Sequence, residues 1–149
     1  GYQFLFAGDG PLRPAVARAA DADPGRVKWV GEVERIGDFL EAIDALVITS
    51  LTEAAPLLLL EAWAAGVPVV STKFPWLDHL ENYHGDLVVP LEPRRSPGPD
   101  SDLQLCLEQT QYRHGLRERV DRARNLVWRS FNASRFGLRW AEYLRSAKP

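Results

Sequence analysis

The sequence lacks several features that mark particular classes of protein. A single cysteine, Cys106, excludes an internal disulfide framework and fits a reducing compartment. No apolar run approaches the roughly 20 residues of a membrane-spanning helix, and the first ten residues do not form a secretory signal. A net charge of −2 provides no overall basic field, so we expect no nucleic-acid partner. Methionine is absent even from the first position, which predicts a piece of a longer protein.

The composition is that of a globular chain with an uneven distribution of charge. Of the 149 residues, 46% are hydrophobic and 26% are charged. Residues 113–148 hold ten Lys or Arg and three Asp or Glu, a local charge of +7, whereas the remainder carries −9. The sequence therefore predicts an acidic body with a basic C-terminal segment.

The first two thirds of the chain alternate short apolar runs with helical patterns. This alternation predicts an α/β fold with a Rossmann-like, doubly wound parallel sheet, in which ligands bind beyond the carboxyl ends of the strands. The loops to search are therefore those after the strands, at 8–11, 31–34, 50–56 and 72–77. Strands are expected at 2–7, 27–30, 45–49, 67–72 and 86–90, and helices at 12–21, 34–43, 56–65 and 77–83.

The pattern changes after residue 90. Residues 90–102 are rich in Pro, Gly and charge, which is typical of a linker. Two amphipathic helices are expected after it, the first with its apolar stripe from Leu116 to Phe131 and the second with Phe136, Trp140 and Leu144. We therefore predict a nucleotide-sugar-binding domain at 1–100, truncated at its N-terminus, and helices at 101–149 that pack on it.

A Gly-x-Gly turn follows the first expected strand. Gly8 and Gly10 match the start of a dinucleotide-binding fingerprint, but its third glycine would fall at Arg13, and Pro11 interrupts the motif. The fingerprint therefore fails, and the segment is interpreted as a strand-to-helix turn that lines a different ligand.

The segment from Ser50 to Gly66 carries more information. Glu53 lies in the loop after a buried strand, and Glu61 lies about one and a half turns into the helix that follows Pro56. The free amides at this helix start (Ala55, Leu57 and Leu58) would present donors to an anion. Carboxylates repel phosphate but suit sugar hydroxyls, so the pattern indicates a sugar nucleotide. The alternative is a solvated Glu53 and a Glu61 that is only a helix-face charge.

Residues 45–70, ALVITSLTEAAPLLLLEAWAAGVPVV, resemble the signature region of glycosyltransferase group 1 enzymes, which have the GT-B fold. The shared pattern is a strand, a Ser, two Glu separated by seven residues, Glu-Ala, small residues, Gly-Pro and a valine-rich strand. The segments GYQFLFAGDGP, VKWVGEV and DLVVP also resemble parts of the C-terminal domain of these enzymes. The resemblance implies the donor-binding half of a GT-B fold without its first strand and helix.

The resemblance also implies roles for individual residues. Glu61 would bind the ribose hydroxyls, and Glu53 would be catalytic, contacting the donor sugar and supporting charge near the anomeric carbon. The donor would be a UDP- or GDP-linked hexose, transferred with retention of configuration and without a metal or other cofactor. The further donor-binding positions are Ala54 and Ala55 for the sugar, Leu57 and Leu58 for the diphosphate, Gly31 for the base, and Ser50, Gly8 and Gly10.

The sequence departs from the family pattern at two loops. Ala54-Ala55 replaces a Gly-Phe pair, which would tighten the donor pocket. The segment Lys73-Phe74-Pro75-Trp76 replaces a pair of glycines, and its bulk would narrow the cleft. Lys73 itself is interpreted as a solvated lysine, with a phosphate contact as the alternative.

The expected partners are a nucleotide sugar and an N-terminal acceptor-binding domain of the same protein. Without that domain this portion would be inactive, and the whole enzyme is expected in the cytoplasm, associated with the membrane surface. Two alternatives remain open: a non-catalytic interaction module with a degenerate GT-B domain, and a sugar-nucleotide epimerase. The histidines and Cys106 lack the spacing of a metal site and are interpreted as structural or surface residues.

Overall fold

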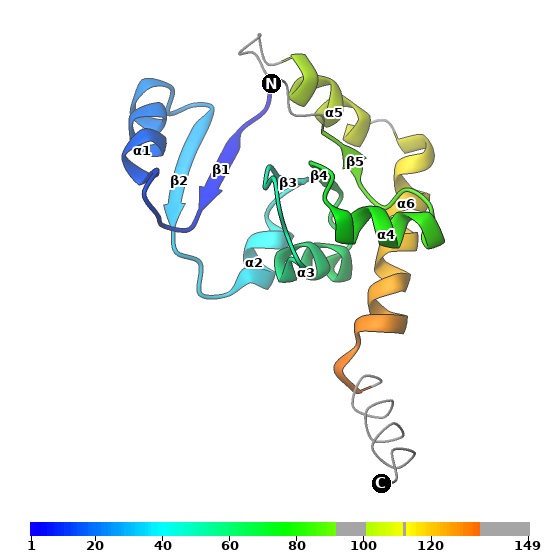
Figure 1. The fold of residues 1–149 in the computed structure, drawn as a ribbon. Coiled ribbons are helices and arrows are strands. Elements are labelled where there is room, and N and C mark those ends of the chain that lie inside the picture. The colour runs from blue at the N-terminus through cyan, green and yellow to red at the C-terminus, as the bar shows by residue number, and fades with distance from the viewer. Residues whose placement is uncertain (92–100, 112, 135–149) are drawn as a thin grey trace, which may run out of the picture. The chain divides into compact units, whose positions relative to one another are not determined.

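A computed structural model describes residues 1–91, 101–111 and 113–134 of the chain. The described chain divides into two compact units, Gly1–Phe39 and Leu40–Pro149 (Figure 1). Both units have a mixed α/β structure with parallel strands, which confirms the predicted fold class. The predicted division at residue 100 stays a prediction.

The first unit is a parallel two-stranded sheet with a connecting helix. Strand β1 (Phe4–Ala7) pairs with β2 (Val27–Gly31), and helix α1 (Arg13–Ala22) contacts β2. The Gly8 amide donates to the Gly31 carbonyl at 2.7 Å, so the two loops that follow these strands are held together.

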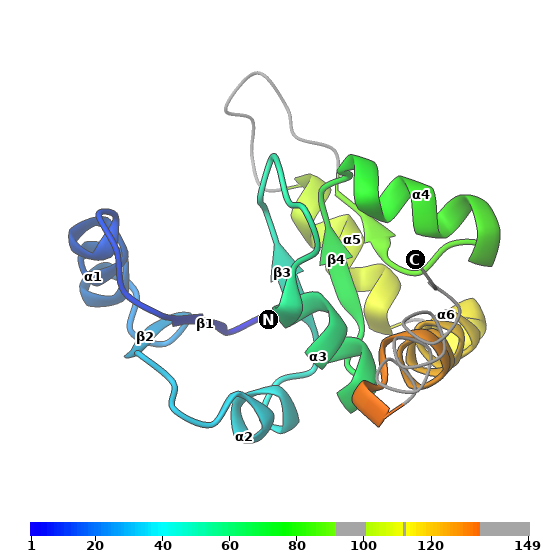
Figure 2. The ribbon, with the colours of Figure 1, turned by 60° about the horizontal axis from the view of Figure 1, so that its bottom comes forward.

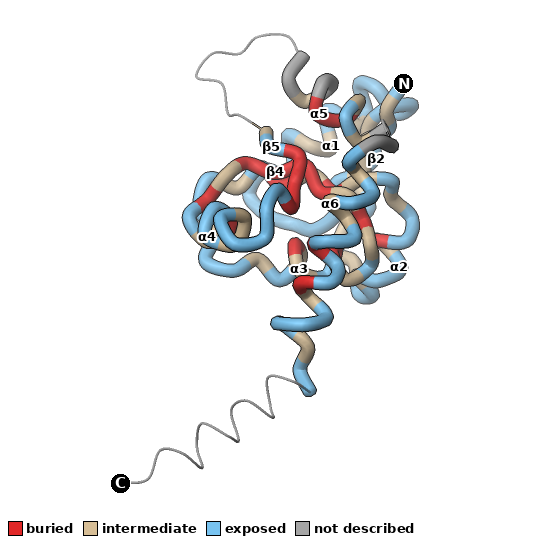
Figure 3. The backbone as a smooth tube through the Cα atoms, turned by 90° about the vertical axis from the view of Figure 1, so that its right-hand side faces the viewer, coloured by how far each residue is buried: buried red, intermediate tan, exposed pale blue. Residues whose placement is uncertain are grey.

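The second unit is built around a three-stranded parallel sheet in the order β3-β4-β5. Its buried strands form the centre of the unit, where Figure 3 shows buried backbone at β4 and β5. Buried helix residues such as Leu59 and Trp63 complete this core. The strands are β3 (Leu46–Ile48), β4 (Val69–Ser71) and β5 (Val89–Pro90), and the helices among them are α2 (Ile36–Glu41, which spans the boundary between the units), α3 (Leu57–Ala65) and α4 (Pro75–His84).

Within each unit the strands pair in parallel, as they do in doubly wound folds. The described residues contain no strand that pairs with both β1 and β3.

Helix α3 ends where the sequence predicts and begins one residue later than predicted, at Leu57. Pro56 is extended (ψ 116°) and precedes the helix rather than forming its first turn. Gly66 ends the helix with φ 77°, a left-handed conformation that favours glycine, and its amide donates to the carbonyls of Ala62 and Trp63. Pro56 before the helix and Gly66 after it therefore determine where α3 begins and ends.

Helices follow the sheet in the C-terminal part of the described chain. The structure adds α5 (Ser101–Gln111), which the sequence analysis did not predict, and shows the expected amphipathic helix as α6 (Arg113–Leu126), continued by a five-residue π-helix, η1 (Val127–Phe131). Helix α6 packs along α3 (Figure 2). No helix in the described ranges is both long and apolar enough to cross a membrane. Most of the predicted linker and the predicted helix around Trp140 lie outside the described residues.

Candidate functional site

The loops after β3 and β4 leave the same edge of the three-stranded sheet, because parallel strands end together. The loop after β3 runs from Thr49 to Pro56 and carries four of the predicted site residues: Ser50, Glu53, Ala54 and Ala55. The loop after β4 begins at Thr72, whose amide donates to the Ile48 carbonyl at 3.1 Å. In a parallel sheet this edge is the usual place for a ligand, and the second unit presents its polar loops there.

The start of α3 offers unused hydrogen-bond donors. Pro56 makes no side-chain capping hydrogen bond, and its carbonyl accepts from Leu59 and Leu60. The amides of Leu57 and Leu58 have no acceptor among the described residues, as helix geometry requires of a first turn without a capping side chain. These donors and the positive end of the helix dipole favour an anion at this position.

Two carboxylates belong to the same loop and helix. Glu53 is half-buried in the loop, and Glu61 is exposed on the same helix face as Leu57, one turn farther along. Side chains on a helix tilt toward its N-terminus, so Glu61 extends back toward the helix start. Within the described part of the chain, neither carboxylate has a hydrogen-bond or ion-pair partner. Both groups are therefore available to a ligand.

Three further predicted positions lie in the first unit. Gly8 and Gly31 are hydrogen-bonded to one another, and Gly10 follows in the same turn. A cavity of about 280 Å³ lies over this turn, lined by Gly8 and Gly10 but not by Gly31. Its wall is fixed by Trp29, whose Nε1 donates to the Gly8 carbonyl at 2.9 Å, and by Arg13, whose guanidinium lies 4.4 Å from the centre of the Trp29 ring.

The bulky loop after β4 packs into the second unit. Phe74 is 2% exposed, and the ring of Trp76 lies 5.9 Å from that of Phe131 in η1. The sequence analysis interpreted Lys73 as a solvated lysine, and this interpretation is wrong. The side chain of Lys73 is 33% exposed and forms an ion pair with Glu81 of α4. The residues that replace the glycines of the family pattern therefore anchor the loop to α4 and η1.

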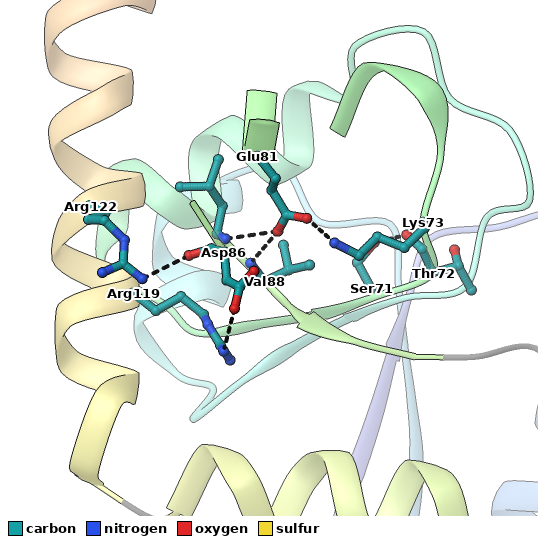
Figure 4. Close-up of polar contacts among 9 residues, drawn as sticks. Ser71, Thr72, Lys73, Glu81, Asp86, Val88, Arg119 and Arg122 are labelled. Carbon is teal, nitrogen blue, oxygen red and sulfur yellow. Dashed lines mark hydrogen bonds and ion pairs between the residues drawn. The ribbon is translucent and has the colours of Figure 1, made fainter. Parts of the chain in front are cut away.

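Glu81 is the polar residue that sequence reasoning missed. Its side chain is only 8% exposed, and its Oε1 accepts from the amides of Leu87 at 2.8 Å and Val88 at 3.2 Å, while Oε2 pairs with Lys73 (Figure 4). Lys73 and Glu81 are eight positions apart, and Lys73 lies before α4, so no pairing pattern within a helix indicates the pair. The sequence signal that was available is a glutamate four residues before Gly85, near the end of an expected helix.

No group of three or more His, Cys, Asp or Glu side chains in the described ranges is arranged to hold a metal ion. On α4, the ring of His79 contacts that of Tyr83 edge-on, with centres 5.2 Å apart. Cys106 is buried, and its sulfur lies 3.2 Å from the Pro90 carbonyl oxygen. His79 and Cys106 therefore have structural surroundings, as the sequence analysis interpreted them.

Comparison with known proteins identifies relatives of the chain. The profile of the family described as Glycosyl transferases group 1 matches residues 1–95. A lipopolysaccharide core biosynthesis glycosyltransferase, LpsE of Rhizobium meliloti (strain 1021), is 36% identical over 75 residues, which are 49% of this chain and 22% of that protein. The chain thus spans about a fifth of the length of this curated relative.

Solved structures show the same fold. The GtfA/B complex matches 97% of this chain and 29% of its own, with a TM-score of 0.73 at 13% identity. The Anabaena protein Alr3699/HepE, solved in complex with UDP and glucose, matches 97% of this chain and 40% of its own, with a TM-score of 0.64 at 23% identity. These neighbours are GT-B glycosyltransferases, which confirms the fold that the resemblance implied.

Proposed function

The chain belongs to the glycosyl transferases group 1 family, and we propose that it is the donor-binding portion of a retaining glycosyltransferase that transfers a hexose from a nucleoside diphosphate sugar. The observation that carries this proposal is the composition of one short segment, from Glu53 to Glu61. It combines two unpaired amides at a helix start with two carboxylates that have no partner among the described residues. A nucleoside diphosphate sugar has the matching arrangement, because its phosphates lie between two rings that bear hydroxyls.

The diphosphate is assigned to the start of α3. The amides of Leu57 and Leu58 would donate to phosphate oxygens. The helix dipole adds a favourable interaction free energy of up to about 1 kcal/mol at an exposed helix end. The amides of Ala54 and Ala55, both exposed, would donate to hydroxyls of the sugar. No metal or other cofactor is part of this proposal.

The carboxylates are assigned to the two rings. Glu61 would accept hydrogen bonds from the ribose hydroxyls, and charge-assisted bonds of this kind are about twice as strong as neutral ones. Glu53 would contact the donor sugar and stabilise the positive charge that develops at the anomeric carbon as the diphosphate leaves. Ser50 lies at the start of the same loop and would assist Glu53.

Gly31 is the proposed contact of the base, and Gly8 and Gly10 are further proposed donor-binding positions. UDP and GDP are the two candidates. The structural relative solved with UDP and glucose makes UDP-glucose the first donor to test.

Transfer requires an acceptor held beside the anomeric carbon, since catalysis of a two-substrate reaction depends on proximity and orientation. We therefore propose an N-terminal acceptor-binding domain of the same protein as the partner, in an enzyme that acts in the cytoplasm at the membrane surface. LpsE is a glycosyltransferase of lipopolysaccharide core biosynthesis, and a growing glycan is the corresponding class of acceptor that we propose here. This chain alone is expected to bind a donor without transferring its sugar.

Calorimetric titration of the chain with UDP, GDP and their glucose conjugates tests the proposal. We expect binding of at least one conjugate, and loss of that binding in Glu61→Ala. Glu118→Ala is the matched control, because Glu118 is also an exposed helical glutamate but lies on α6. Absence of binding by the wild-type chain, or equal binding by Glu61→Ala, would overturn the proposal and favour a non-catalytic interaction module.

A further inference from the structure

The loop that carries Glu53 is held mainly at its ends. Among the described residues, no hydrogen bond involves any residue from Leu51 to Ala55. The loop is joined to α3 at Pro56 and to β3 at the other end, near Ser50. The restraint at Ser50 therefore has a strong influence on where Glu53 lies.

Thr72 supplies that restraint. Its side chain is 3% exposed, its hydroxyl donates to the Ser50 carbonyl, and its amide donates to the Ile48 carbonyl at 3.1 Å. One residue of the neighbouring strand end thus binds two carbonyls of the chain that leads into the loop. Ser50 lies only three residues before Glu53, so a shift of Thr72 would displace the start of the loop.

Lys73 and Glu81 hold Thr72 in turn. Lys73 directly follows Thr72, and its ammonium pairs with Glu81, which is itself fixed by the amides of Leu87 and Val88. Leu87 and Val88 are 2% and 1% exposed, so Glu81 is bound to the buried segment that leads into β5 (Figure 4). The hydrogen bonds of Glu81, its ion pair with Lys73, the peptide bond from Lys73 to Thr72 and the hydrogen bond from Thr72 therefore link the core of the second unit to Ser50.

We propose that Glu81, Lys73 and Thr72 form a positioning relay that fixes the start of the Glu53 loop and thereby sets the affinity of the chain for a nucleoside diphosphate sugar. Their side chains act through the Ser50 carbonyl, and the carboxylates of Glu53 and Glu61 remain the proposed ligand contacts. The effect on the loop rests on the contacts above, whereas the effect on affinity also rests on the proposed function.

Two variants remove single links of the relay. Thr72→Val keeps the size of the side chain but removes the hydroxyl, and Lys73→Met keeps the length but removes the charge. The control is Arg119→Ala. Nη2 of Arg119 lies 3.7 Å from Oδ2 of Asp86, which belongs to the turn between α4 and β5, and Arg119 lies outside the relay. Thr72→Ser retains the hydroxyl and serves as the conservative rescue.

Nuclear magnetic resonance of the full chain gives the direct measurement. In Thr72→Val and Lys73→Met we expect the carbonyl-carbon signal of Ser50 to shift and the backbone order parameters of residues 50–53 to fall from the rigid value of about 0.85 to below about 0.6. Thr72→Ser and Arg119→Ala should retain the wild-type values. We also expect about a tenfold rise in the Kd for UDP-glucose in the first two variants, measured under conditions in which urea denaturation shows each variant to be folded.

The two measurements separate the relay from the function. If the Ser50 signal and the order parameters are unchanged in both Thr72→Val and Lys73→Met, the relay is wrong, whatever the chain binds. The relay is also wrong if Arg119→Ala changes them equally. If the loop responds but the wild-type chain binds no nucleotide sugar, the relay stands as a restraint on the loop, and the proposed function and the effect on affinity both fail.

Discussion

Two neighbouring strand–loop–helix segments of the same sheet use their glutamates in opposite ways. In the β3–α3 segment, Glu53 and Glu61 have no partner among the described residues. In the β4–α4 segment, Glu81 has three partners and is 8% exposed. Because both segments leave the same edge of the sheet, position in the fold does not distinguish the proposed ligand-binding carboxylates, Glu53 and Glu61, from the structural carboxylate of Glu81. The number of protein partners distinguishes them.

The physical reason for this difference is the cost of burial. A buried carboxylate must be paired and hydrogen-bonded, since an isolated charge is strongly unfavourable away from water. An exposed or half-buried carboxylate such as Glu61 or Glu53 stays solvated and can exchange water for a ligand. We therefore expect substitutions in the two segments to separate stability from binding.

Glu81→Ala is expected to have the largest effect, on stability. The change leaves the Lys73 ammonium and the buried amides of Leu87 and Val88 without their acceptor, and each unsatisfied buried donor costs about 1–3 kcal/mol. Urea denaturation followed by circular dichroism would measure the free energy of unfolding. A loss below about 1 kcal/mol would contradict the structural role of Glu81.

Glu61→Ala is expected to affect binding and leave stability nearly unchanged. Hydrogen bonds to a charged group contribute about 1.5–3 kcal/mol, so the Kd for the bound nucleotide sugar should rise roughly 10- to 100-fold. The free energy of unfolding should change by less than about 0.5 kcal/mol, because Glu61 is exposed and has no partner among the described residues. A similar loss of affinity in Glu118→Ala would show that the effect is not specific to the site.

The sequence predicts the elements well where local signals are strong. Helix α3 matches its predicted range, 56–65, to within one residue, because Pro56 and Gly66 mark its ends. Helix α5 was missed, because the Pro-rich run before it suggested a linker up to residue 102, whereas the helix begins at Ser101. The π-helix η1 continues the same amphipathic pattern as α6, so periodicity did not reveal the change in hydrogen bonding.

The same contrast holds for the candidate site: some of its residues could be proposed from local sequence, and others depend on tertiary contacts. Glu53 and Glu61 could be identified because they follow a buried strand and flank a helix start, all within twelve residues. The packing of Trp76 against Phe131 joins residues far apart in the sequence, and the environment of Lys73 depends on a turn beyond α4. Such contacts are set by tertiary structure, so no local pattern predicts them.

Gly66→Ala tests whether the β3–α3 segment can lose stability without losing its ligand contacts. Gly66 has φ 77°, a conformation that costs a residue with a Cβ atom about 1–2 kcal/mol. The nearest atom to an added Cβ would be Nη1 of Arg124, at 4.0 Å, so the cost is conformational rather than steric. Urea denaturation should show this loss, while calorimetry should show a Kd close to that of the wild-type chain. A large change in Kd would mean that the C-terminal end of α3 helps to set the donor site.

Arg119→Ala gives the smallest expected effect and tests whether burial, rather than charge alone, separates the two kinds of carboxylate. Asp86 lies in the same turn that Glu81 holds, but its side chain is 74% exposed, and its Oδ2 lies 3.7 Å from Nη2 of Arg119. A pair with one exposed partner contributes at most about 1 kcal/mol, and salt screens it. Urea denaturation at low and high ionic strength should therefore show a small loss that shrinks as salt is added. A loss as large as that of Glu81→Ala would mean that α6, rather than the buried glutamate, holds this turn in place.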